Sequence, residues 1–177
     1  NVRSTEPAHC GGKPEFFGKS PAQGATLTQF WTAGLKVETE WEASYTMNGV
    51  AQFDFDRYQF SRPTGMTCTA FDNYGYAKCT WFPTQAQAAA GDHPHCAVVY
   101  DKFGRASERR CMTLKVYPPC APNEDRVGTQ CLPKCAPGFE RSTSSTNCVD
   151  IDECARNTDN CSQYEGCSNT VGSFNCS

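Results

Sequence analysis

Acidic side chains and cysteines are crowded together in the last stretch of the chain, VDIDECARNTDNCSQYEGCSNTVGSFNCS, residues 149–177. Asp-Ile-Asp-Glu stands directly before Cys154, and four cysteines fall within 23 positions. Carboxylate oxygens are ligands for hard cations, whereas cysteines form disulfides or bind zinc. So polar a stretch raises two questions, namely what folds it and what it would hold.

The cysteine content of the whole chain favours disulfides. The 177 residues include 13 cysteines and only three histidines, which fits zinc sites poorly. Because cytosolic thiols are kept reduced, an oxidising, extracellular compartment is predicted. The net charge of −3 gives no basic field for nucleic acid or anionic lipid, and no apolar run approaches the roughly 18 residues of a membrane span. We therefore expect a secreted or cell-surface protein that binds other proteins or copies of itself, without nucleic acid and without membrane insertion.

The cysteines also divide the chain. Residues 14–118 hold four of them and residues 119–177 hold eight, with the change at PPC, residues 118–120. This predicts a boundary near Pro118. The start, NVRSTEPAHC, has no initiator Met and no apolar secretory segment, and the last cysteines break off in mid-pattern, so we expect a piece of a longer secreted chain. The predicted parts are an entry segment at 1–13, a β-sandwich at 14–118, a four-cysteine module at 119–149 and a final module at 150–177.

Short runs with alternating apolar positions fill the first part. They are LKVETEWEASY, AQFDFDRYQF, YAKCTWF, CAVVYD and CMTLKVY, separated by Gly, Pro, Asn or Asp. Such runs predict the strands of one antiparallel sandwich. PTQAQAAAG is the only helix candidate, and it is short enough to be a turn. The expected core consists of Trp31, Trp41, Phe53, Phe55, Trp81, Val99, Leu114 and Val116.

One hairpin is especially clear, in HCAVVYDKFGRASERRCMTLKVY. If its strands pair about a turn at residues 101–105, Cys96 lies opposite Cys111, close enough for a disulfide. A second bridge, between Cys68 and Cys79, would close TCTAFDNYGYAKCTW in the same way. The register also places one set of apolar side chains on a single face: Ala97, Val99, Met112, Leu114 and Val116.

The stretch from Cys79 to Tyr117 resembles the end of immunoglobulin-like repeats of large secreted and cell-surface proteins. In those repeats a Trp-x-Pro-Thr stretch precedes a cysteine strand, an Asp-x-x-Gly turn and a second cysteine strand, as in WFPT, DKFG and RRCMT here. The resemblance implies an immunoglobulin-like antiparallel β-sandwich.

Residues 119–149 contain four cysteines and hardly any large apolar side chain. Two disulfides must therefore replace a core, and four cysteines permit three connectivities. CAPGFERSTSSTNC resembles the last loop of an EGF module, and this resemblance implies Cys135 with Cys148 and Cys120 with Cys131. The three-residue gap between Cys131 and Cys135 departs from the one-residue gap usual in EGF modules.

The final stretch resembles the calcium-binding EGF-like family. Both halves of the family signature are present, DIDE before the first cysteine and Cys-x-Asn-x-x-x-x-Phe-x-Cys in CSNTVGSFNC. The resemblance implies calcium, which takes six to eight oxygen ligands. The implied ligands are the side chains of Asp150, Glu153 and Asn169 and the carbonyls of Ile151, Thr170 and Ser173.

The same resemblance implies disulfides between Cys154 and Cys167 and between Cys161 and Cys176, and calcium that stiffens the link to the preceding module. The family's fifth and sixth cysteines are absent, so the domain is expected to be incomplete. The alternative is that the acids form a solvated linker and that Asn169 favours a turn. Asn169 also matches a β-hydroxylation pattern of the family, and Asn160 and Asn175 stand in weak glycosylation sequons, each with a middle cysteine.

An enzyme is not expected. His9, His93 and His95 occur without a nucleophile elbow, a phosphate loop or a His-x-x-x-His pair. HPH could be a weak metal pair but is typical of a loop. Asp54 and Asp56 could bind a second calcium ion, although alternation in FDFDRYQF favours Phe53 and Phe55 inside and the aspartates in water.

The predicted function is structural or adhesive, as part of a repeat protein in a matrix, fibre or surface appendage. The alternatives are the ectodomain of a receptor or ligand that recognises a protein partner, and a secreted protease inhibitor. Parity leaves Cys10 without a partner, so we expect it to bond outside this chain segment, unless it bonds with Cys68 or Cys79 and frees the other.

Overall fold

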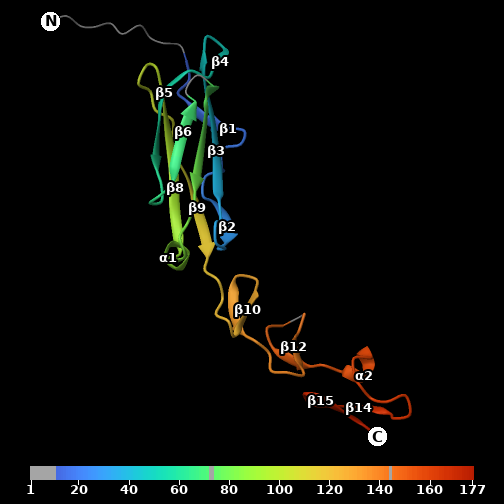
Figure 1. Cartoon of the computed structure of the whole chain (residues 1–177). Coiled ribbons are helices and arrows are strands. Elements are labelled where there is room, and N and C mark those ends of the chain that lie inside the picture. Colours follow the sequence, from blue (N-terminus) through green and yellow to red (C-terminus); the bar gives the residue numbers. More distant parts are fainter. Residues whose placement is uncertain (1–10, 72–73, 144) are drawn as a thin grey trace, which may run out of the picture. The chain divides into compact units, whose positions relative to one another are not determined.

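The computed structural model describes residues 11–71, 74–143 and 145–177. His9 and Cys10 lie outside these residues, so the predicted external bond of Cys10 stays a prediction. The chain divides into two units, Asn1–Pro119 and Cys120–Ser177. Strands dominate both units (Figure 1).

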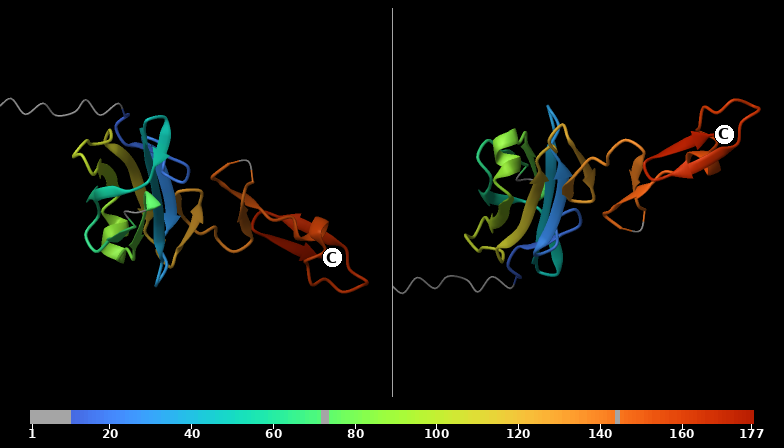
Figure 2. Two further views of the ribbon diagram at one scale, coloured as in Figure 1. Left: turned by 90° about the horizontal axis from the view of Figure 1, so that it is seen from above. Right: turned by 90° about the horizontal axis from the view of Figure 1, so that it is seen from below.

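The first unit is a sandwich of two sheets, seen edge-on in Figure 2. One sheet has the order β1-β3-β7-β6, with β4 added to β3, and the other has the order β2-β9-β8-β5. These orders correspond to the ABED and GFC sheets of immunoglobulin-like sandwiches. All pairs are antiparallel except β2 with β9, which is parallel and was not predicted. The strand bounds are Glu15–Phe17 (β1), Ala25–Phe30 (β2), Val37–Met47 (β3), Val50–Gln52 (β4), Phe55–Ser61 (β5), Thr67–Phe71 (β6), Tyr76–Trp81 (β7), Asp92–Asp101 (β8) and Arg110–Tyr117 (β9).

The core lies between the two sheets. In β3 every second residue from Val37 to Tyr45 is buried, and the same alternation buries Ala77, Cys79 and Trp81 in β7. Alternation is the consequence of strand geometry, because successive side chains point to opposite faces. In the hairpin of β8 and β9, Cys96 lies opposite Cys111. The side chains expected on its inner face are all buried, namely Ala97, Val99, Met112, Leu114 and Val116.

Phe53 is a wrong prediction for the core. It is 41% exposed, because the chain leaves β4 at Gln52 and begins β5 only at Phe55. The intervening Asp54 accepts a hydrogen bond from the Tyr45 hydroxyl and forms an ion pair with Lys102. Asp56 is likewise paired with Arg57, so each of the two aspartates has a basic partner.

The HPH residues lie in β8 rather than in a loop. His95 is fully buried, and its Nδ1–H donates to the Ser61 carbonyl at 3.2 Å. Its Nε2 accepts from the Trp41 Nε1–H at 3.2 Å and lies 3.1 Å from the Thr39 hydroxyl. Burial lowers the pKa of His95 below its ordinary value. His95 is therefore a neutral part of the core.

A short helix connects the two sheets. The helix α1, Gln85–Ala89, begins at a capping box in which Thr84 and Gln87 bond reciprocally. Trp31, another expected core residue, is half-buried against the core and donates its Nε1–H to the Pro83 carbonyl at 2.8 Å.

The second unit consists of three hairpins and one helical turn. The bounds are Glu124–Val127 (β10), Gln130–Pro133 (β11), Phe139–Arg141 (β12), Cys148–Asp150 (β13), Glu153–Arg156 (α2), Cys167–Thr170 (β14) and Ser173–Cys176 (β15). None of its described side chains is buried. No helix in the described ranges is long and apolar enough to cross a membrane.

Six disulfides join the described cysteines, and they are the pairs of the sequence hypothesis. Two lie in the sandwich, Cys68–Cys79 and Cys96–Cys111. The other four lie in the second unit: Cys120–Cys131, Cys135–Cys148, Cys154–Cys167 and Cys161–Cys176.

Candidate calcium site

Asp150 is held by the hairpin of the four-cysteine module. It is the last residue of β13 and pairs with Phe139 of β12. The next residue, Ile151, donates its backbone N–H to the Gly138 carbonyl at 2.9 Å. The first residue of the predicted site therefore belongs to the module that precedes the site.

Glu153 is placed by the start of α2. Asp152 caps this helix, because its Oδ1 accepts from the Ala155 N–H at 2.8 Å. Glu153 is the first helical residue, and its Oε2 is buried without a hydrogen-bond partner among the described residues. A buried carboxylate oxygen without a donor costs free energy, which a bound cation would offset.

Asn169 comes from β14, across from Phe174 of β15. Its Nδ2–H donates to Asp150 Oδ2 at 2.8 Å, and the Gly172 N–H donates to Asp150 Oδ1. The bond to Asp150 fixes the Asn169 amide and leaves its Oδ1 available to a cation. The hairpin thus brings an amide and a carboxylate together that are 19 positions apart in the chain.

The remaining predicted ligands are backbone carbonyls. Thr170 and Ser173 pair with one another at the end of the β14–β15 hairpin, and the Thr170 hydroxyl donates to the Ser173 carbonyl at 2.9 Å. A carbonyl oxygen has two lone pairs, so this bond leaves one for a further partner. The donor set of carboxylate, amide and carbonyl oxygens fits calcium.

Sequence reasoning missed the contacts between the two modules of the second unit. A Cβ atom on Gly138 would lie 2.0 Å from the Gly172 carbonyl oxygen, and one on Gly172 would lie 2.8 Å from Cε2 of Phe139. Only glycines permit this approach. Glu140 also pairs with Arg156, which lowers the pKa of that carboxyl group through their hydrogen bond. The Pro-Gly-Phe stretch before β12 was the available signal.

Other groups of metal-ligating side chains offer no alternative site. Three such clusters occur in the described part of the chain, and each contains two cysteines. All of these cysteines are bonded in disulfides, whereas a metal needs the free thiolate.

The predicted glycosylation residues are both exposed. Asn160 follows α2 in the loop before Cys161, and Asn175 lies in β15 opposite Ser168. Their modification stays a prediction.

The residues of this site fall within a family match. Residues 150–177 match the family model of the calcium-binding EGF domain. Human fibulin-2 is 38% identical over 64 residues, which are 36% of this chain and 5% of fibulin-2. Wall-associated receptor kinase 2 of Arabidopsis thaliana is 43% identical over 58 residues, or 32% of this chain and 8% of that protein. The chain thus spans only a small part of these relatives.

Among solved structures, the titin M3 domain aligns with a TM-score of 0.39 and 11% identity, covering 60% of this chain and 98% of that domain. The SrpA adhesin of Streptococcus sanguinis aligns at 0.41 and 9%, covering 98% and 88%. The family match, the fibulin similarity and the disulfides indicate an extracellular protein whose residues 150–177 are similar to calcium-binding EGF domains.

Proposed function

We propose that this chain is an extracellular structural or adhesive segment in which calcium fixes the four-cysteine module to the EGF-like domain. The ligands would be the side chains of Asp150, Glu153 and Asn169 with the carbonyls of Ile151, Thr170 and Ser173. The observation that carries the proposal is the buried Oε2 of Glu153, which has no partner among the described residues, together with the hydrogen bond that joins Asn169 to Asp150 of the preceding module.

The ligands come from both modules. Asp150 ends β13, whereas Glu153 and Asn169 belong to α2 and β14. A calcium ion would be coordinated by these oxygens and would offset their negative charge. Because residues of both modules would hold it, the entropy lost on ordering the link is offset by binding. Contacts at Gly138 and Gly172 already pack the modules together, so the ligands would only have to stiffen this junction.

A calcium titration followed by isothermal calorimetry tests the proposal. The chain should bind calcium in the range of about 10⁻⁴ to 10⁻³ M that is typical of extracellular modules. Glu153→Gln should weaken the affinity by about tenfold or more, because it removes one charge from the ligand set. Glu165→Gln is the matched control, since Glu165 is an exposed carboxylate of the same domain that bonds only Ser162 there. Equal affinities in the two variants would contradict the assignment.

A receptor ectodomain is the second candidate, and the similarity to a wall-associated receptor kinase favours it. The two functions differ in what the rest of the protein contains. Many sandwich and EGF copies in the full-length sequence would support a matrix or fibre protein, and a single copy before a membrane span would support a receptor.

A further inference from the structure

A groove runs along one side of the sandwich, between the terminal strands of its two sheets. β5 ends one sheet and β6 ends the other. The groove has a volume of about 520 Å³ and is lined by Arg57, Tyr58, Gln59 and Phe60 of β5, by Arg62, and by Cys68 and Ala70 of β6.

The edge of β6 presents main-chain groups to this groove. Cys68 lies opposite Cys79 with a Cα–Cα distance of 4.0 Å, which identifies a non-hydrogen-bonded pair. The N–H and C=O of Cys68 therefore point away from β7, and those of Ala70 do so by alternation. Within the described ranges β6 pairs with no second strand, so these groups have no main-chain partner.

Across the groove, the edge of β5 contributes aromatic side chains. The Val99 N–H in β8 donates to the Ser107 hydroxyl, and the Val99 carbonyl accepts from the Ser107 N–H. Both main-chain groups of Val99 therefore point away from β5. Tyr58, opposite Val99, is therefore in a non-hydrogen-bonded pair, and its main-chain N–H and C=O point away from β8. The main-chain groups of Phe60, two residues further along β5, point the same way by alternation. The half-buried rings of Tyr58 and Phe60 stack 5.8 Å apart and form the apolar wall of the groove.

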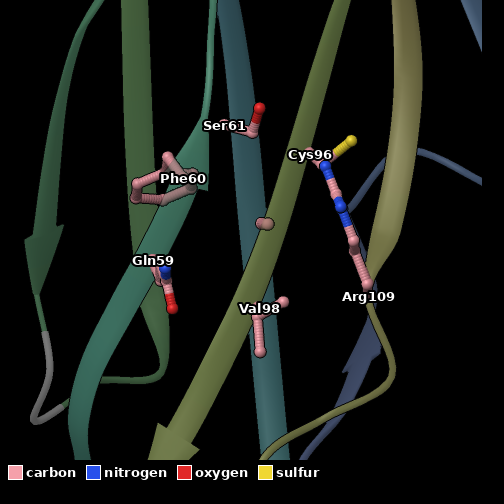
Figure 3. Close-up of a pocket in the computed structure, with 7 residues that line it drawn as sticks. Gln59, Phe60, Ser61, Cys96, Val98 and Arg109 are labelled. Carbon is pink, nitrogen blue, oxygen red and sulfur yellow. The ribbon is translucent and has the colours of Figure 1, made fainter.

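A smaller hollow near β5, which Phe60 also lines, exposes no strand edge. It has a volume of about 180 Å³, and Figure 3 shows Gln59 and Ser61 of β5, Cys96 and Val98 of β8, and Arg109 around it. β5 and β8 pair with one another there, so no strand edge is exposed to it.

The charges of the groove select the partner. Its lining includes two basic residues, Arg57 and Arg62, and no acidic residue. The Arg57 guanidinium lies over the Tyr100 ring, 4.2 Å from its centroid, and is paired with the exposed Asp56. Arg62 forms no ion pair in the part of the chain that the structure describes. Arg62 directly follows the last residue of β5, Ser61. A second copy of this chain would bring the same arginines against these, which like-charge repulsion disfavours.

We propose that this groove binds an extended, acidic peptide segment of a partner protein as an added strand on β6. The backbone would bond with Cys68 and Ala70, alternate side chains would contact Tyr58 and Phe60, and an acidic residue at one end would meet Arg62. The site is distant in sequence from the calcium ligands and does not depend on them.

Two synthetic peptides test the proposal on the whole isotope-labelled chain by NMR. Both contain about five residues of alternating valine and threonine. One has glutamates at both ends and the other has lysines. The glutamate peptide should shift and protect the amides of Cys68 and Ala70 and bind about tenfold more tightly than the lysine peptide.

N-methylated versions of the glutamate peptide test strand addition itself. Methylation of one set of alternate amides should abolish binding, whereas methylation of the other set should leave it nearly unchanged, because only one set faces β6. Arg62→Glu should reverse the preference between the two peptides. Lys134→Glu changes the net charge equally in the second unit and should not.

Three outcomes would overturn the proposal. They are absence of binding at about 1 mM peptide, equal effects of the two methylation patterns, and a concentration-dependent dimer of the free chain that protects the same amides. The last outcome would assign the groove to a second copy.

Discussion

The two units of this chain are held together by different means. In the sandwich, Trp41, Trp81, Val99 and Leu114 are almost completely buried between two sheets. In the second unit none of the described side chains is buried, and four disulfides join its short hairpins. A module of this size cannot exclude enough apolar surface from water to offset its conformational entropy, so covalent closure replaces the core. Similar disulfides therefore contribute differently to folding in the two units: they replace a core in the second unit and add to an existing core in the sandwich.

Removal of one disulfide from each unit should show the difference between the two units most clearly. The loops closed by Cys135–Cys148 and Cys96–Cys111 span 13 and 15 residues, so each bridge contributes about 3 kcal/mol in the chain-entropy model. Replacing both Cys135 and Cys148 by serine should unfold the β12–β13 hairpin. Calcium binding should then be lost, because this hairpin positions Asp150. The same change in the sandwich should leave it folded but less stable.

Amide chemical shifts report on the hairpin, and urea unfolding followed by tryptophan fluorescence reports on the sandwich, which contains the buried Trp41 and Trp81. Native chemical shifts in the β12–β13 hairpin of the Cys135/Cys148 variant would contradict this difference between the units. Unfolding of the sandwich in the Cys96/Cys111 variant would contradict it as well.

A cavity in the core should have the next largest effect. Leu114 is 1% exposed, and Leu114→Ala should lower the free energy of unfolding of the sandwich by about 2 to 5 kcal/mol. Val50 is 60% exposed, so Val50→Ala should change it by less than about 0.5 kcal/mol. Calcium affinity should be the same in both variants, since the site lies in the other unit. Equal urea midpoints for the two variants would contradict the assigned core.

A single added methyl group should disturb the second unit. Gly138 has a φ of 80° and lies against Gly172, so Gly138→Ala should cost about 1 to 3 kcal/mol in backbone strain and also separate the two modules. Gly128→Ala is the matched control. Its φ is 60°, but an added Cβ would meet no atom within 4 Å. Calcium affinity should fall only in Gly138→Ala, and an equal fall in both variants would leave strain as the sole cause.

The smallest effect should come from pH, and only in the sandwich. The pKa of His95 is lowered in the folded state by burial and by the nearby Arg62, while its bond to Ser61 acts in the opposite direction. A lowered pKa means that folding favours the neutral ring of His95. The resulting stabilisation is complete above the pKa of the unfolded state, 6.5, and is lost as pH falls through the pKa of the folded state. The urea midpoint should therefore be lower at a pH of about 5.5 than at about 7.5.

His95→Gln should reduce this pH dependence, because an amide can donate to Ser61 and accept from Trp41 without titrating. His93→Gln should retain it, since His93 bonds the Gln87 carbonyl near the surface. A steeper or unchanged slope in His95→Gln would assign the effect to other groups.

Much of the fold follows from local sequence. Alternation identifies β3, β7, β8 and β9, and the Asp101–Arg105 turn fixes the register that sets Cys96 against Cys111. The resemblance of the stretch around Asn169 to the calcium-binding EGF-like family likewise predicts calcium. These features depend on residues close in the chain, whose relative positions are limited by strand and turn geometry.

Other features depend on which distant segments meet. Ala25–Phe30 also alternates, yet nothing within it predicts that it lies parallel to β9 rather than antiparallel to a neighbour. The break at Phe53 and Asp54 arises because Tyr45 and Lys102, from elsewhere in the sandwich, bond the aspartate. The approach of Gly138 to Gly172 also joins segments that no local pattern relates.

Alternation and spacing in the sequence thus predicted the sandwich class and the two disulfides of its hairpins, whereas the family resemblances implied the other four disulfides and the ion ligands. Only the three-dimensional structure shows that Glu153 Oε2 is buried without a partner among the described residues, that Asp150 belongs to the preceding hairpin, and that β5 and β6 are edges facing one groove. The physical reason is that periodicity specifies which face of a strand is buried, whereas burial of a single atom and exposure of a strand edge depend on every element packed around them.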